Sequence, residues 1–99
     1  MTGIQEQVLK LEGALTMEHA AGYLAEGRRL AASGSLIVDF SAVSESDSAA
    51  LALVLDWLRT SAASGGQLHL KATPAGLSSL AELYGVAELL PQGEVVESA

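Results

Sequence analysis

The feature that most constrains the fold is a repeated alternation between short strand-like segments and longer helix-like segments. Residues 36–40, Leu-Ile-Val-Asp-Phe, form a nearly continuous apolar run, which is typical of a strand covered on both faces. Residues 7–11 and 67–71 alternate apolar and polar side chains, as half-buried strands do, and residues 8–12 suit an edge or outer strand. A helix-like segment follows each of the three. The order β–α–β–α–β–α predicts an α/β layer fold in which crossover helices pack on a mostly parallel sheet.

We expect one domain over residues 1–99, because a chain of this length has room for a single core. The predicted sheet has four or five strands and is mixed or mostly parallel. Residues 4–6 are expected to extend the first strand or to form one of their own, and residues 92–99 to form a short strand or a frayed tail. The helices should lie mainly on one face, because they carry broad Ala/Leu faces and only one strand has the doubly covered pattern.

The first helix is predicted to begin after Thr16, a suitable N-cap residue, and to end at Ser33-Gly34. Gly27 lies inside this helix, where glycine costs up to about 1 kcal/mol relative to alanine. We therefore expect another element to pack closely against Gly27.

The second helix is predicted over residues 48–61 and ends before Gly65-Gly66. Trp57 is placed near one edge of its apolar stripe, and Asp56 and Arg59 share the outer face. The residues predicted to form the inner stripe are Leu51, Val54, Leu55 and Leu58.

The third helix is expected to begin at Pro74 and to end before Gly85, with Val86 making the hydrophobic contact of a Schellman ending. Pro91 prevents further continuation. The residues predicted to face inward are Leu77, Leu80, Ala81 and Leu83.

Composition excludes several classes of function. Five basic and twelve acidic residues give a net charge of -7, which disfavours binding to nucleic acid or to an anionic membrane surface. The longest apolar run, residues 49–55, is too short to insert into a membrane, and the N-terminus lacks the apolar region of a signal peptide. We therefore expect a cytoplasmic protein. Because 49% of the residues are hydrophobic, some apolar surface is expected to contact a partner.

The candidate functional segment is a serine-rich stretch, predicted to be a loop, that enters the second helix at Asp47-Ser48. A serine hydroxyl in the first turn of a helix is accessible and can be phosphorylated. Because Glu45 and Asp47 would repel the phosphate, modification is expected to change the exposed surface more than it stabilises the helix. The alternative is an ordinary N-cap, worth about 1 kcal/mol.

The sequence gives no pattern expected of an enzyme, a metal site or a cofactor site. Ser48 with His19 or His69 has no nucleophile elbow and no triad spacing. The two histidines lack further ligands for a metal, and Gly65-Gly66 precedes a strand rather than a helix, unlike a phosphate loop. Asp39 is expected to accept backbone hydrogen bonds as a structural residue. We predict no catalytic residues and no cofactor.

Four stretches in order resemble STAS domains (sulphate transporter and anti-sigma factor antagonist). The Asp-Ser pair followed by small residues and leucine is by itself a moderately specific sign of this family. Its combination with the later Gly-Gly-Gln-Leu stretch is a strong sign of the family. Ala50 stands where the family usually has glycine, which leaves less room for a partner. The matching stretches are residues 36–41 (Leu-Ile-Val-Asp-Phe-Ser), 47–51 (Asp-Ser-Ala-Ala-Leu), 65–70 (Gly-Gly-Gln-Leu-His-Leu) and 83–86 (Leu-Tyr-Gly-Val).

The resemblance implies a STAS fold and a binding module without an active site, in which Ser48 corresponds to the family's phosphorylatable Ser/Thr. Residues 80–91 look most like the small cytoplasmic STAS subunit of the Mla phospholipid ABC transporter of Gram-negative bacteria. That subunit binds the ATPase within a complex with a membrane permease. The alternative is an anti-sigma factor antagonist controlled by phosphorylation of Ser48. The expected partner-binding residues are Glu45, Ser46, Asp47, Ser48, Ala49, Ala50 and Leu51.

Overall fold

The sheet has three parallel strands in the order β1-β2-β3 across residues 6–90, the part of the chain that the computed structural model describes. The predicted number of four or five strands is wrong for these residues, and the parallel pairing is confirmed. Except for Glu6, which belongs to β1, the predicted additional strand segments lie outside the described residues. The strands are β1 Glu6–Leu15, β2 Ser35–Ser46 and β3 Leu68–Lys71.

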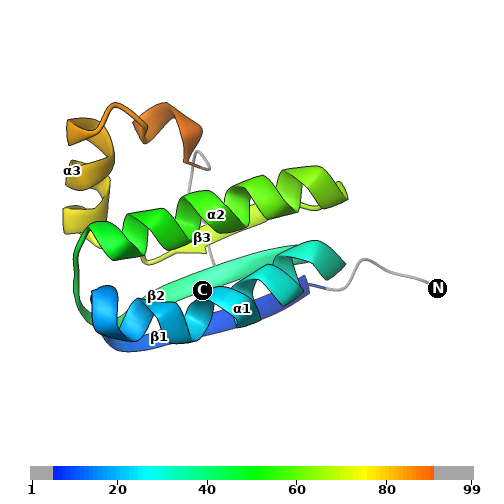
Figure 1. Ribbon diagram of the computed structural model, residues 1–99, viewed down its shortest axis with the longest axis horizontal. Helices are drawn as coiled ribbons and strands as arrows, with labels where there is room; N and C mark the ends of the chain where they lie inside the picture. Colours follow the sequence, from blue (N-terminus) through cyan, green and yellow to red (C-terminus); the bar gives the residue numbers. More distant parts are fainter. Residues whose placement is uncertain (1–5, 91–99) are drawn as a thin grey trace, which may run out of the picture.

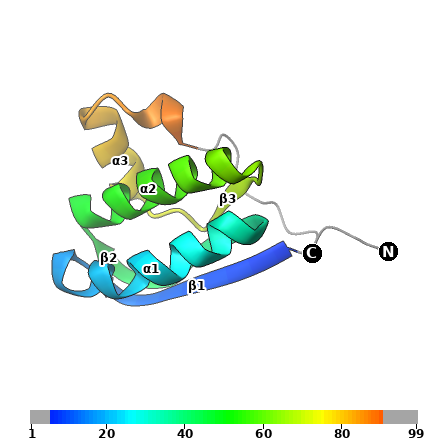
Figure 2. The same ribbon diagram turned by 45° about the vertical axis from the view of Figure 1, so that its right-hand side comes forward.

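Two long helices, α1 and α2, lie side by side over one face of the sheet, and α3 lies beside the start of α2 on the side away from α1 (Figures 1 and 2). The expected placement of the helices mainly on one face is thus confirmed within the described residues. The helices are α1 Met17–Ser33, α2 Ser48–Ser64, α3 Ala75–Leu83 and the 3-10 helix η1 Ala87–Leu89.

Alternation along β2 sets the two faces of the sheet. Leu36, Val38 and Phe40 belong to the core beneath the helices, and each is at most 2% exposed. Ile37 and Asp39 point to the opposite face because successive side chains alternate, yet both are buried as well. The predicted doubly covered strand is confirmed for residues 36–40.

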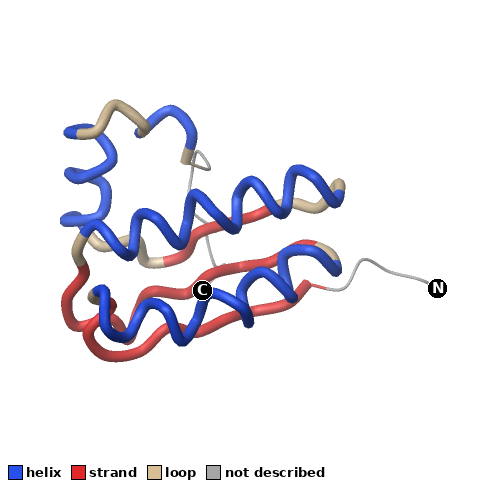
Figure 3. Tube along the Cα trace, in the orientation of Figure 1, coloured by secondary structure: helices blue, strands red, loops and turns tan. Residues whose placement is uncertain are grey.

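The sequence predicts a loop for the serine-rich stretch after Phe40, and this prediction is wrong. The stretch forms the second half of β2 (Figure 3). It pairs with the end of β1, where Leu15 stands beside Ser46. The register shifts twice along this pairing, and Gly13, in β1, has a φ of 75°. Irregular pairing of this kind re-aims the chain, so β2 delivers Asp47 to the start of α2.

Gly27 makes the close contact that its place in α1 predicts. The glycine is buried, and a Cβ built on it would overlap the indole ring of Trp57 on α2. The Trp57 Nε1–H donates to the Leu24 carbonyl at 3.1 Å. Trp57 is 0% exposed, so its predicted place at the edge of the stripe is wrong. The tryptophan lies in the core and joins the two long helices.

The buried side of α2 is broader than the predicted stripe. Leu51 and Val54 are buried as expected, whereas Leu55 and Leu58 are only half-buried. A helix that packs against both a sheet and a second helix buries more than one stripe. The remaining buried residues of α2 are Ala50, Leu53, Trp57 and Ser61.

The end of α3 confirms the predicted Schellman motif. Val86 N–H donates to the Ala81 carbonyl at 2.8 Å, and Gly85 N–H donates to the Glu82 carbonyl at 3.1 Å. Val86 packs against the core. Leu77 and Ala81 are buried as predicted, but Leu83, which was also expected to face inward, is 75% exposed.

Candidate functional site

Asp47 is the N-cap of α2, and Ser48 is the first residue of the helix. The Asp47 Oδ1 accepts a hydrogen bond from Ala49 N–H at 2.8 Å, and the Asp47 carbonyl accepts one from Ala50 N–H at 3.0 Å. Ser48 is exposed, and its hydroxyl makes no hydrogen bond to any described residue. Capping thus belongs to Asp47, which leaves the Ser48 hydroxyl open to solvent.

Replacing Asp47 with alanine should lower the free energy of unfolding by about 1 kcal/mol, the usual cost of a lost N-cap. Ser48→Ala is the matched control and should lower the free energy of unfolding by only a few tenths of a kcal/mol. The reason is that the Ser48 hydroxyl makes no hydrogen bond to any described residue. Urea denaturation of both variants measures the difference. If Ser48→Ala is the more destabilising change, the assignment of the cap to Asp47 fails.

The structure narrows the predicted docking surface. Ala50 is 0% exposed and Leu51 is 3% exposed, so both lie in the core and position the helix start rather than contact a partner. Glu45 and Ser48 are exposed. The residues that remain available at the surface are Glu45, Ser46, Asp47, Ser48 and Ala49.

A cavity of about 490 Å³ lies between the start of α2 and α3, and Ser48 is on its wall. The sequence does not predict the contribution of α3 to this site. A signal for it exists, because Leu83 falls outside the helical stripe that joins Leu77, Leu80 and Ala81. Exposed Leu83 and Tyr84 give the cavity an apolar wall. The full lining is Ser46, Asp47, Ser48, Gly76, Ser79, Leu80, Leu83 and Tyr84.

Asp39 has the structural role that the sequence predicts. Its Oδ1 accepts a hydrogen bond from Ser41 N–H at 2.8 Å, and this bond is the main reason that the pKa of Asp39 is lowered. Lys10 on β1 and Lys71 on β3 are its register partners and lower the pKa further, against the opposing effect of burial. Asp39 lies on the sheet face opposite the helices.

Asp39→Asn should reduce the free energy of unfolding at pH 7 by about 1 kcal/mol, the typical net contribution of one hydrogen bond. A carboxyl whose pKa is lower in the folded state than in the unfolded state stabilises the fold above its unfolded pKa of about 4. That stability is lost as the pH falls through the folded pKa. The two urea unfolding curves should therefore converge below about pH 4. Glu12→Gln, at an exposed position, is the control, and a pH-independent difference for Asp39→Asn contradicts this account.

Neither histidine contacts Ser48 through a hydrogen bond in the described residues. His19 is in the first turn of α1, with Nδ1 3.4 Å from the Thr16 hydroxyl, and His69 is half-buried on β3. No hydrogen bond among the described residues joins either ring to Ser48. Within residues 6–90, no three His, Cys, Asp or Glu residues are grouped in a way that could hold a metal ion.

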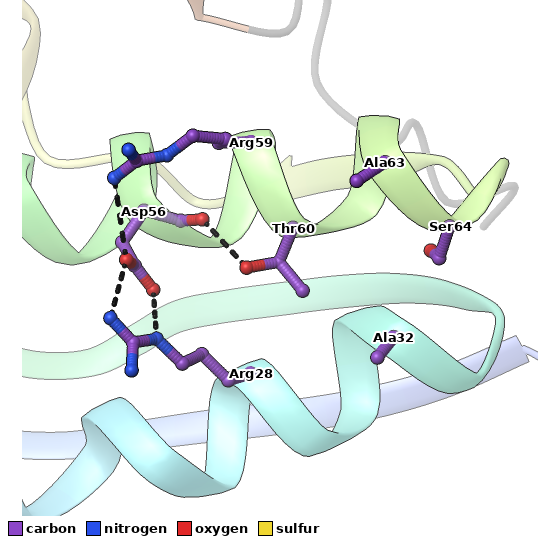
Figure 4. A pocket seen from close by; sticks show the side chains of 7 residues that line it. All are labelled: Arg28, Ala32, Asp56, Arg59, Thr60, Ala63 and Ser64. Carbon is purple, nitrogen blue, oxygen red and sulfur yellow. Dashed lines mark hydrogen bonds and ion pairs between the residues drawn. The ribbon is translucent and has the colours of Figure 1, made fainter.

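A second polar cluster joins α1 to α2 (Figure 4). Arg28 donates to both carboxylate oxygens of Asp56, through Nε at 2.8 Å and Nη2 at 2.9 Å. Arg59 approaches the same carboxylate at 3.6 Å from the next turn of α2. The Arg28 hydrogen bonds lower the pKa of Asp56, with a smaller opposing effect of desolvation. A cavity of about 500 Å³ lies beside this cluster.

None of the helices in the described residues combines the length and the apolar character needed to cross a lipid bilayer.

Comparison with protein families identifies the class. The chain belongs to the STAS domain family, because the family model described as "Mlab, STAS domain" matches residues 2–91. The structure is similar to that of the anti-sigma factor antagonist SpoIIAA in its unphosphorylated form, with a TM-score of 0.72 and 20% sequence identity. That match covers 98% of this chain and 86% of SpoIIAA, and at this identity it shows the shared fold. A search of curated proteins finds no match.

Proposed function

We propose that this protein is a non-enzymatic accessory subunit that binds the ATPase of a phospholipid ABC transporter and supports its assembly and activity. The observation that carries the proposal is the exposed start of α2, with Ser48 beside a partly apolar cavity. Such a surface suits docking to another protein, because exposed apolar side chains and a few polar groups lie together. The family description that includes Mlab supports the choice of partner.

In this proposal the protein is cytoplasmic and reaches the inner membrane only through the ATPase and its permease. The ATPase supplies the catalytic residues and the nucleotide site. Purified protein is therefore expected to hydrolyse neither ATP nor esters. A hydrolysis rate that disappears in Ser48→Ala would show that the serine is a nucleophile and would end the proposal.

An anti-sigma factor antagonist is the second candidate function. The fold similarity to SpoIIAA favours it, as does the exposure of Ser48 at the start of a helix. A phosphate on Ser48 would lie at the positive end of the α2 dipole and, at the same time, near the carboxylates of Asp47 and Glu45. Phosphorylation would then change the charge of the docking surface and could release a partner.

A tagged pull-down from the native host, followed by mass spectrometry, separates the two candidates. Recovery of an ABC ATPase together with its permease supports the transporter role, and recovery of a kinase-like anti-sigma factor supports the antagonist role. Ser48→Arg is expected to lose the partner in either case. Ala62→Arg places the same side chain on an exposed position about 20 Å further along α2 and should keep it. Normal assembly and ATPase activity of the transporter in cells that lack this protein contradicts the first proposal.

A further inference from the structure

A groove runs between α1 and α2 on the outer side of the helix layer. Two cavities of about 340 and 500 Å³ form it, and both are lined by Arg28, Asp56 and Arg59. At one end the groove has small alanine side chains and Met17, which is 74% exposed. We call this surface the arginine groove and define it by Met17, Ala20, Ala49, Ala52, Arg28 and Arg59.

The arginine groove is set apart from the rest of the molecule by its charge. Helices α1 and α2 hold all three arginines of the chain and three acidic residues, so the net charge of -7 lies entirely outside them. Arg28 is held by Asp56 through two hydrogen bonds. The side chain of Arg59 is 81% exposed. Its contact with the Asp56 carboxylate, at 3.6 Å, is longer than the two hydrogen bonds that Arg28 makes to the same group. Arg59 is therefore available to a further acidic group.

The opposite kind of surface lies at the other side of α2. Leu83 and Tyr84 at the end of α3 are 75% and 55% exposed, and Leu89 in η1 is 58% exposed. Glu82 and Glu88, which precede Leu83 and Leu89 in the chain, are also exposed. We call these five residues the α3–η1 surface. It combines large apolar side chains with negative charge, whereas the arginine groove combines apolar side chains with exposed positive charge.

We propose that the arginine groove binds the α3–η1 surface of a second copy of this chain. Within one copy the two surfaces cannot meet, because α3 packs beside α2 on the side away from α1 (Figures 1 and 2). Between copies they are complementary in both respects, since apolar side chains meet apolar side chains and glutamates meet Arg59. The small alanines of the groove let a partner's helix approach closely.

This self-association goes beyond binding to a transporter or to an anti-sigma factor. Leu83 and Tyr84 also line the cavity beside Ser48, so a copy whose α3–η1 surface is occupied has that cavity covered. Self-association and partner binding then exclude one another. A reciprocal arrangement of both surfaces gives a closed two-fold dimer, and a one-way arrangement gives an open series of oligomers.

Sedimentation equilibrium of the purified full chain tests the proposal, up to about 1 mM protein, where even a weak association of about 4 kcal/mol is populated. Salt of about 0.15 M screens the general repulsion between acidic molecules beyond about 8 Å. The wild-type mass should rise with concentration. Arg59→Glu should weaken the association at least tenfold, and so should the double variant Glu82→Arg/Glu88→Arg.

The most specific test is an equimolar mixture of Arg59→Glu with the double variant Glu82→Arg/Glu88→Arg. Opposite charges again face each other across the interface in this mixture, so association should be restored. Arg29→Glu is the matched control: it makes the same charge change on α1, at a side chain that is 66% exposed, pairs with Glu26 and does not line the groove. A monomeric wild type at the highest concentration overturns the proposal. So does an equal loss in Arg29→Glu, or a mixture that stays monomeric although both variants are folded.

Discussion

Gly27→Val is expected to lower the free energy of unfolding by about 3 kcal/mol, the upper end of the usual cost of overpacking a core. The reason is the position of Trp57, whose indole ring occupies the space of any Cβ at Gly27. A rigid, fully buried ring cannot rotate away as a flexible side chain does. Moving the ring also breaks its hydrogen bond to the Leu24 carbonyl. The measurement is the midpoint and slope of urea denaturation.

Gly22→Val is the matched control for this prediction. It makes the same change on the same helix, but a Cβ at Gly22 meets no atom within 4 Å. This variant should be as stable as the wild type or slightly more stable, because valine has a better helix propensity than glycine. Equal effects of the two substitutions would show that helix propensity, and not contact with Trp57, governs Gly27.

Trp57→Leu supplies a second check through a double-mutant cycle. The smaller side chain should itself cost stability, and it should also make room for a Cβ at Gly27. Gly27→Ala should therefore cost clearly less in the Trp57→Leu background than in the wild type. Purely additive free energies would mean that the two residues do not interact.

The pair Gly27 and Trp57 shows how far the sequence determines the packing. A glycine inside a helix indicates a close contact by its cost alone, so that contact could be predicted. Its partner could not be predicted, because the sequence pattern places the apolar residues of α2 on one stripe. In the structure α2 packs against the sheet and against α1, and the side toward α1 makes Trp57 central.

Strand β2 also has one part that could be predicted from local sequence and one part that depends on distant residues. The apolar run of residues 36–40 predicts a buried strand because it needs no knowledge of its neighbours. The following serines have no strand pattern, and they are held in β2 by their pairing with the end of β1. Pairing between segments some thirty residues apart is a tertiary effect that can override local preference.

The candidate site likewise has a part that could be predicted from local sequence and a part that depends on tertiary packing. The helix start at Asp47-Ser48 could be located from sequence, because a capping residue, small side chains and an apolar run are local features. The wall contributed by Leu83 and Tyr84 depends on how α3 packs against α2, which no local pattern gives. Ala50 and Leu51 are predicted to be partner-binding residues because they adjoin Ser48, although Leu51 is also predicted in the inner stripe. The turn of the helix carries both into the core.

Ser48→Arg is expected to weaken binding of the ATPase by at least tenfold, which corresponds to about 1.4 kcal/mol. Interface energy is concentrated in a few central residues, and a long cation at the first position of α2 would fill the space where a partner approaches. Ser48→Glu should act in the same direction and approximates the charge of a phosphate. Because Ser48 is exposed, thermal melts of both variants should match the wild type.

The decisive experiment titrates the recovered ATPase with wild type, Ser48→Arg, Ser48→Glu and Ser48→Ala, alongside thermal melts of each. Ser48→Ala should bind with nearly wild-type affinity, because removing an exposed hydroxyl leaves the surface shape almost unchanged. Ala62→Arg controls for the added charge, because Ala62 lines neither the cavity beside Ser48 nor the arginine groove. If Ser48→Arg is folded and binds as tightly as Ala62→Arg, the docking surface lies elsewhere. Ser48 would then be an ordinary first-turn residue next to the Asp47 cap, and the exposed Leu83 and Tyr84 would become the next positions to substitute.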